Sequence, residues 1–208
     1  MKKTLPLAAL LWIGVVLLLP AHAQTPESAT DGARFSSDGK LQFPGDYRGE
    51  WVYLTSGLGM TYGPTQPAAG EPRFFDNVFV NPQSYRAFVK TGRWPDKTMF
   101  ILEVRNSEQK ASINNGGQTQ GPRILAIESS VKDARFPDGW GYFEFGGGTR
   151  PIAREGELKP QSESCYACHK ANTAVENTFV QFYPTLMDVA QRLGTVKPTY
   201  DPNHKVSP

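Results

Sequence analysis

Thr98-Met99-Phe100-Ile101-Leu102-Glu103-Val104 is a run of strand-forming residues that is apolar on both faces except at Glu103. A strand with two apolar faces is buried on both sides, so this run predicts the central strand of a sheet. Neighbouring runs rich in β-branched and aromatic residues predict the other strands. These runs are Trp51 to Thr55, Phe74 to Val80, Arg123 to Ser130 and Trp140 to Phe145. Asn114-Asn115-Gly116-Gly117 is a turn signal between two of the strands.

Helices are predicted beside and after the strands. Asn81-Pro82 is a typical helix start, and Gly92 is a typical helix end. Toward the C-terminus, Val175, Phe179 and Phe182 recur at helical spacing, and a second helical piece runs from Pro184 to Gly194. Because strands precede helices, the expected fold class is α+β, a mainly antiparallel β-sheet with flanking helices.

The first residues have the pattern of a secretory signal peptide. Lys2 and Lys3 precede an apolar stretch from about Leu5 to Leu19, and Ala21-His22-Ala23 forms a small-x-small end. We expect cleavage after Ala23 and export; an uncleaved anchor is the alternative, for which the apolar run is slightly short. The expected organisation is a signal peptide at 1–23, a polar linker at 24–40, one domain at 41–194 and a flexible tail at 195–208.

Charge excludes one class of partner. Removing residues 1–23 takes the 22 basic residues of the 208-residue chain to 20, against 20 acidic residues. A chain without net charge and without a run of like charges has no basic field for nucleic acid, so we expect no nucleic-acid partner. The 185 residues that remain suffice for one domain with a core.

One motif carries the chemistry. Cys165-Tyr166-Ala167-Cys168-His169 contains the only two cysteines of the chain. Cys-x-x-Cys-His is the attachment signature of a c-type haem, in which two thiols form thioethers and the adjacent imidazole binds the iron. We therefore expect one covalent haem c on a C-terminal helix, bound by Cys165 and Cys168 and ligated by His169.

Other interpretations of the motif explain less of it. A structural disulfide or a redox-active dithiol between Cys165 and Cys168 does not need a histidine directly after the second cysteine. Zinc would need four ligands, and the other histidines are His22 in the leader and His204 near the end of the tail.

The order of motifs resembles the cytochrome P-460 family. The similarity spans about Leu41 to Met187. It is carried by Phe75-Asp76-Asn77-Val78-Phe79-Val80-Asn81-Pro82, Tyr85-Arg86-Ala87-Phe88, Thr91-Gly92-Arg93-Trp94-Pro95-Asp96, the strand with Glu103, Ser130-Val131-Lys132-Asp133 with Phe136-Pro137, and the run from Cys165 through Phe179, Phe182, Tyr183 and Pro184.

This resemblance implies a mono-haem c-type protein on a β scaffold, a homodimer in the periplasm, where c-type haem is attached. It also implies a five-coordinate iron with His169 as the proximal ligand by motif position. The family has two functional kinds. Enzymes that oxidise hydroxylamine have a haem cross-linked to a lysine, and cytochrome c-prime-beta proteins bind nitric oxide or carbon monoxide behind a phenylalanine.

The cross-linking lysine belongs on the strand after the Trp-Pro-Asp turn, and Met99 to Val104 contains none. Lys97 directly precedes this strand and is the alternative candidate, although a lysine at a strand entrance is usually solvated. Phe100 has two interpretations, core residue or distal cap above the iron.

A sixth iron ligand has few candidates. His204 lies in the tail, and Met60, Met99 and Met187 are each ordinary gap-filling residues by spacing. Glu103 and Glu144 lie in apolar strands, where they serve as proton relays or, as we favour, pair with Arg105 or Arg123. Arginines and Trp140 are candidates for the haem propionates.

The predicted function is an exported cytochrome whose open haem binds or transforms a small gaseous or nitrogenous ligand, with nitric oxide favoured because the lysine is missing. A hydroxylamine-oxidising enzyme is one alternative. A simple electron carrier with a periplasmic redox partner, which would need a six-coordinate iron, is the other.

Overall fold

The computed structural model describes residues 32–62, 71–109 and 112–203. Within them, seven strands form one sheet in the order β1-β7-β6-β5-β4-β3-β2, and every neighbouring pair is antiparallel. The strands are β1 (Leu41–Gln42), β2 (Val52–Leu58), β3 (Phe74–Val80), β4 (Met99–Gln109), β5 (Gln118–Lys132), β6 (Trp140–Gly146) and β7 (Glu155–Leu158). The α+β class with a mainly antiparallel sheet is confirmed.

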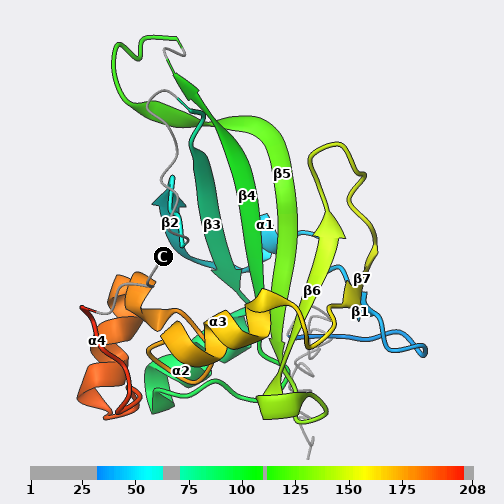
Figure 1. Cartoon of the computed structure of the whole chain (residues 1–208), viewed down its shortest axis with the longest axis vertical. Helices are drawn as coiled ribbons and strands as arrows, with labels where there is room; N and C mark the ends of the chain where they lie inside the picture. The colour runs from blue at the N-terminus through cyan, green and yellow to red at the C-terminus, as the bar shows by residue number, and fades with distance from the viewer. Residues whose placement is uncertain (1–31, 63–70, 110–111, 204–208) are drawn as a thin grey trace, which may run out of the picture.

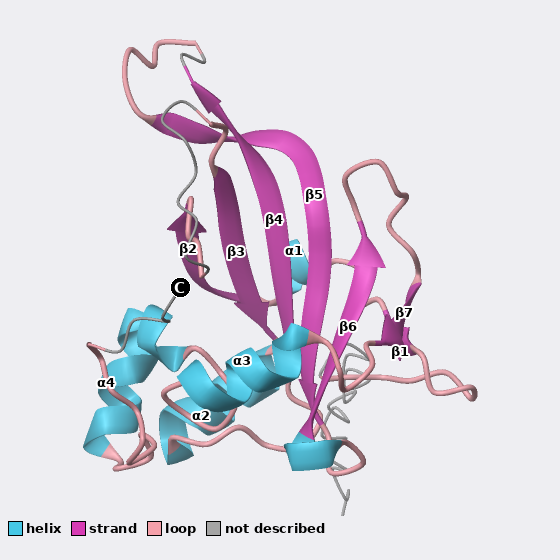
Figure 2. Ribbon diagram, viewed as in Figure 1, coloured by secondary structure: helices cyan, strands magenta, loops and turns pink. Residues whose placement is uncertain are grey.

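Four α-helices accompany the sheet in the described ranges, and three of them gather at one end of one face (Figures 1 and 2). They are α1 (Tyr47–Glu50), α2 (Pro82–Thr91), α3 (Ser164–Asn172) and α4 (Pro184–Arg192). In Figure 1, α2, α3 and α4 gather at the lower end of the sheet, with α3 in front of it and α4 to its left, and α1 lies behind the sheet. We call the front side the helix-side face and the other side the far face. None of the described helices is long and apolar enough to cross a membrane.

β4 is a central strand, as its sequence predicts. It pairs with β3 on one side and β5 on the other, and Met99, Phe100 and Ile101 are all buried. Because side chains alternate along a strand, Phe100 contributes to the core under the helices, whereas Met99 and Ile101 contribute to a second core on the far face. The sheet therefore separates two hydrophobic clusters.

The predicted helix after Asn81 is also observed. Pro82 occupies the first turn of α2, and the helix ends at Gly92, whose φ of 70° lies in the left-handed region that glycine adopts readily. The Asn81 side chain does not cap the helix; its Oδ1 instead accepts the backbone N–H of Met99 at 2.9 Å. This bond ties the start of α2 to the start of β4.

The helix expected over Val175 to Phe182 is not formed. Val175 and Thr178 make a β-bridge around Glu176, whose φ is 50°, and only a single 3₁₀ turn follows at Val180–Phe182. Of the three residues at helical spacing, Val175 is buried but Phe182 is 38% exposed, so they do not form one buried helix face. The second predicted piece is α4.

Ordered contacts extend beyond residues 41–194 at both ends. Ala33 donates its N–H to the carbonyl of Lys97 at 2.9 Å, and Phe35 packs against Phe136 and Phe143. Lys197 donates its N–H to the carbonyl of Ala174 at 2.8 Å. Part of each segment expected as linker or tail therefore packs on the domain.

Glu103 is the one charged residue of the central run, and it lies at the far face. Its side chain is 2% exposed and pairs with Arg105 and with Tyr47 and Arg48 of α1. Burial alone would raise the pKa of Glu103, but the hydrogen bonds from Arg105, Tyr47 and Arg48 outweigh it and lower the pKa. The carboxylate is thus a structural anchor for α1.

We expect Glu103→Gln to lower the free energy of unfolding by about 3 kcal/mol at pH 7, because removing one partner of a buried ion pair leaves the other charges unpaired. The contribution of Glu103 is present above its unfolded-state pKa of 4.5 and is lost as the pH falls through the lowered folded-state pKa. Urea unfolding at pH 7 and in acid measures both effects. Glu50→Gln, at an exposed position of α1, is the control, and an equal loss in both variants would contradict the assignment.

Candidate haem site

The predicted haem-attachment residues lie together on α3. Cys165 and Cys168 are three positions apart in the helix and therefore share one side of it, and His169 follows directly. Both thiols are free, and all three side chains are partly buried. Figure 1 shows α3 lying across the helix-side face, and Tyr166 and His169 of α3 contact the ring of Tyr142 on β6. The helix thus presents two thiols and one imidazole next to the sheet.

The ring of His169 is held by packing and by one hydrogen bond. It lies 4.6 Å from the ring of Tyr142 on β6 and 4.6 Å from the ring of Phe179. His169 Nδ1 is 2.9 Å from the carbonyl oxygen of Asn177. Burial lowers the pKa of His169, so the imidazole is neutral near pH 7. With Nδ1–H donating to Asn177, the lone pair of Nε2 is the one available to a metal.

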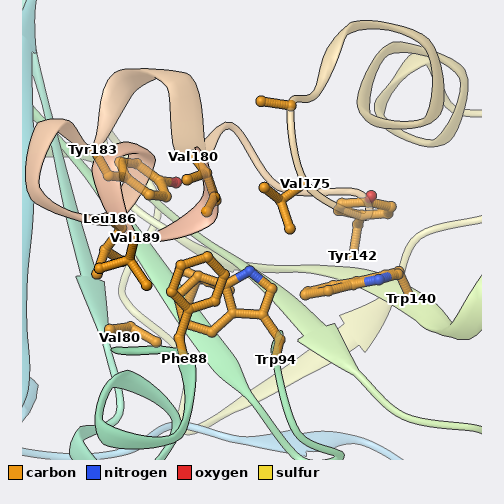
Figure 3. Packing of buried hydrophobic residues seen from close by; sticks show 13 residues of the cluster. Val80, Phe88, Trp94, Trp140, Tyr142, Val175, Val180, Tyr183, Leu186 and Val189 are labelled. Carbon is orange, nitrogen blue, oxygen red and sulfur yellow. The ribbon is translucent and has the colours of Figure 1, made fainter. Parts of the chain in front are cut away.

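Tyr142, whose ring packs against His169, also carries a buried hydroxyl. The side chain is 4% exposed, and its hydroxyl is buried without a hydrogen-bond partner among the described residues. Burial raises the pKa of Tyr142, so the hydroxyl stays protonated. Buried hydroxyls normally have partners, and an orphaned one beside His169 fits a site that a non-protein group completes. Trp140 and Tyr142 project from the same side of β6 into the core under the helices (Figure 3).

Two carboxylates that were not predicted as site residues lie on the same face of the sheet. Asp76 on β3 alternates with Val78 and Val80, which both belong to the helix-side core, and Glu128 on β5 pairs across the sheet with Leu102. Burial, followed by the charge of Glu128, raises the pKa of Asp76 to about 6. Burial and then Glu128 also raise the pKa of Cys165. Glu128 is therefore near both the thiol of α3 and Asp76.

The sequence of the strands contains a pattern that could have identified Asp76 and Glu128. Both interrupt runs of apolar residues, as Glu103 does, and period-two alternation assigns each to a face. Asp76 shares the face of Val78, whereas Glu103 shares the face of Met99 and Ile101. Chain position alone could not bring Asp76 and Glu128 toward Cys165.

The two acids predicted from the sequence are engaged in ion pairs. Glu103 pairs with Arg105, one of the two expected partners, and lies on the far face. Glu144 pairs with Arg150 and with Lys159 at 3.2 Å, instead of with Arg123. The ion-pair interpretation therefore describes both acids better than a relay does. Trp140 is 2% exposed and packs in the helix-side core.

Lys97 lies on the far face, away from the haem motif, whereas Phe100 lies on the helix-side face with α3. Lys97 pairs with Asp133, and its Nζ lies 5.5 Å from the ring centre of Phe35, which packs on the far-face core. Phe100 is 4% exposed and contacts the rings of Trp94, Trp140 and Tyr183. Its role as a core residue is supported.

The methionine candidates are dispersed. Met99 is 1% exposed in the far-face core, and Met187 packs against the helix-side core from α4. Met60 Sδ lies 3.7 Å from the hydroxyl of Tyr62, whose ring stacks on Phe179 at 6.2 Å. Met60 is thus linked through Tyr62 to Phe179, whose ring contacts His169. His204 lies outside the described residues, as does His22.

In the described ranges, no three His, Cys, Asp or Glu side chains gather to form a metal site. The donor set of α3 fits a haem instead: two free thiols on one side of a helix, followed by a neutral, hydrogen-bonded imidazole. An antiparallel sheet with such a helix on one face defines a sheet-based cytochrome, a class distinct from the helical-bundle cytochromes.

The family model for cytochrome P460 matches residues 44–180, and the chain belongs to this family. Membership implies a haem cofactor, and the matched range includes Cys165, Cys168, His169 and the acids of β3 and β5. A comparison with curated proteins gives no match.

We expect Glu128→Gln to lower the pKa of Asp76 from about 6 without restoring it to 3.8, because burial contributes more to the shift than Glu128 does. Titration of the aspartate carboxyl carbons by NMR measures the change. Glu144→Gln is the matched control. Glu144 lies opposite Glu128 on the neighbouring strand, but its charge is paired with Arg150 and Lys159. An Asp76 pKa that moves equally in both variants would contradict direct coupling.

Proposed function

We propose that this chain is an exported mono-haem c-type cytochrome whose open iron site binds a small nitrogen species. Cys165 and Cys168 would hold the haem through two thioethers, and His169 would be its proximal ligand. The observation that carries the proposal is the state of His169. The ring is neutral, and its Nδ1–H is hydrogen-bonded to the Asn177 carbonyl, so the lone pair of Nε2 is free to bind an iron.

A five-coordinate iron is supported by the scarcity of other ligands. Met99 is buried on the far face, and Met187 packs against the helix-side core from α4. The β4 side chains that share a face with Phe100 are Leu102 and Val104, which offer no ligand atom. The haem would supply an iron with one free position, and the apolar strand residues would exclude water from it.

Nitric oxide is the favoured ligand because β4 offers no lysine to the helix-side face. Lys97, the alternative for a cross-link, pairs with Asp133 and lies against Phe35. Diatomic nitric oxide needs no proton acceptor, and an apolar wall of Leu102 and Val104 accommodates it by size alone.

Hydroxylamine oxidation remains the second candidate because of Asp76 and Glu128. Oxidation of a nitrogen hydride releases protons, and two carboxylates on the helix-side face are suited to accept them. A simple electron carrier is the third, and Met60 is the residue on which it would depend.

Export and assembly complete the proposal. The leader pattern of residues 1–23 supports cleavage near Ala23 and a periplasmic location. We further propose a homodimer and a periplasmic redox partner on the basis of the family resemblance.

We expect the purified protein to retain haem in a denaturing gel, and a Cys165→Ala/Cys168→Ala variant to lose it. The ferrous protein should change its absorption spectrum with nitric oxide and with carbon monoxide, as an open iron does. Replacing Met60, Met99 and Met187 singly should leave the ferric spectrum unchanged. Loss of a ligand band in one methionine variant would support the electron carrier instead.

For the enzymatic alternative, we expect no steady hydroxylamine oxidation with an artificial electron acceptor, and no red-shifted absorption of a cross-linked haem. If turnover is observed, Glu128→Gln should slow it at least tenfold by removing a proton acceptor. Glu103→Gln, on the far face, should leave turnover unchanged. Steady turnover would overturn the preference for ligand binding.

A further inference from the structure

The loop of residues 173–178, which follows α3, is attached on both sides of Asn177, to β5 on one side and to the loop between α2 and β4 on the other. Lys132 Nζ, at the end of β5, lies 2.7 Å from the Glu176 carboxylate. Trp94 Nε1 donates to Thr178 Oγ1 at 2.9 Å. Lys132 Nζ also donates to the Trp94 carbonyl at 2.6 Å, which links the two anchors. Asn177 therefore lies between two residues, Glu176 and Thr178, that are held by the linked side chains of Lys132 and Trp94.

Glu176 needs this support because its backbone is strained. Its φ of 50° lies in the left-handed region, which is unfavourable for a residue with a side chain. The ion pair to Lys132 is shielded from solvent, with the side chains 27% and 17% exposed, so it is stronger than a typical surface pair. Thr173 Oγ1, 2.8 Å from the Glu176 carbonyl, adds a second restraint.

The carbonyl that this loop holds is the one that binds His169. Asn177 O accepts from His169 Nδ1 at 2.9 Å, and a partner on the second ring nitrogen fixes the orientation of a ligating histidine and raises its basicity. A carbonyl one residue away from a strained, ion-paired position moves when that pair is removed. The strength of the Nδ1–H···O bond therefore depends on Lys132 and Glu176.

We propose that the Lys132–Glu176 ion pair is a positioning device that sets how strongly His169 donates electrons to the iron. Neither residue touches the imidazole; both act through the Asn177 carbonyl. The inference rests on the proposed role of His169 as the proximal ligand. It assigns a function to two residues that the Cys-x-x-Cys-His motif does not contain.

The test compares Glu176→Gln, Lys132→Met and the double variant in the haem-loaded protein. A weaker Nδ1–H···O bond makes His169 a poorer donor, so the iron–histidine stretching frequency should fall. The ferrous-to-ferric ratio at a fixed potential should rise about tenfold, which is about 59 mV for one electron. The double variant should shift no further than either single variant, because the two residues act as a pair. Lys132→Arg should stay near the wild type.

Lys170→Met is the matched control. Lys170 follows His169 on α3 and pairs with Asp138 at 2.9 Å, but both side chains are exposed and neither holds the Asn177 loop. This variant should leave the stretching frequency and the potential unchanged. Equal shifts in Lys170→Met and Glu176→Gln would overturn the proposal, as would unchanged values in all variants.

A measurement that does not depend on iron ligation separates this inference from the proposed function. The Nδ1–H resonance of His169 in ¹⁵N-histidine-labelled protein reports its hydrogen bond directly and should move in Glu176→Gln. If it moves while the wild type has no iron–histidine band, the ligand role fails and the positioning of the ring stands. If it does not move, the positioning role is wrong.

Discussion

Burial of β4 on both of its faces is the constraint on which the rest of the structure depends. Phe100 anchors the core under α2 and α4, and Met99 and Ile101 anchor the core under α1 and the N-terminal segment. Each buried large side chain contributes about 1.5–3 kcal/mol, so slipping this strand by one residue would exchange the two cores. The register of β4 therefore determines which residues of β3 and β5 face α3.

The same constraint explains how far the sequence predicts the molecule. The central strand, the antiparallel pairing of β4 with β5 and α2 follow from local patterns. Two apolar faces, the turn signal at residues 114–117 and a Pro-to-Gly span each determine one of them. β1 and β7 have no such pattern, since they are short and partly polar. The helix predicted around Glu176 is wrong because it rested on the spacing of Val175, Phe179 and Phe182, which does not reveal that the chain turns back between Val175 and Thr178.

The candidate site was predictable in part for a similar reason. Cys165, Cys168 and His169 are adjacent in sequence, so their spacing alone indicates their chemistry. Tyr142, Asp76 and Glu128 come from three different strands, and only the sheet register brings them to the face of α3. Lys132 and Glu176 are 44 positions apart and are joined only by the return of the chain after α3. Pairings of this kind require the tertiary structure.

The alternation of side chains between the two faces of the sheet also determines which residues lie on the same side as α3. Residues of β4 with odd numbers from Met99 to Glu103 lie on the far face, and so does the Lys97 side chain that contacts Phe35. The helix-side positions of β4 are Phe100, Leu102 and Val104, none of which can form a covalent bond to a haem or move a proton. Polar groups on that face come from the neighbouring strands, as Asp76 and Glu128. Because these two carboxylates can bind or release protons, this face is suited to affect ligand chemistry, while the thiols and the imidazole proposed for haem attachment and iron ligation all come from α3.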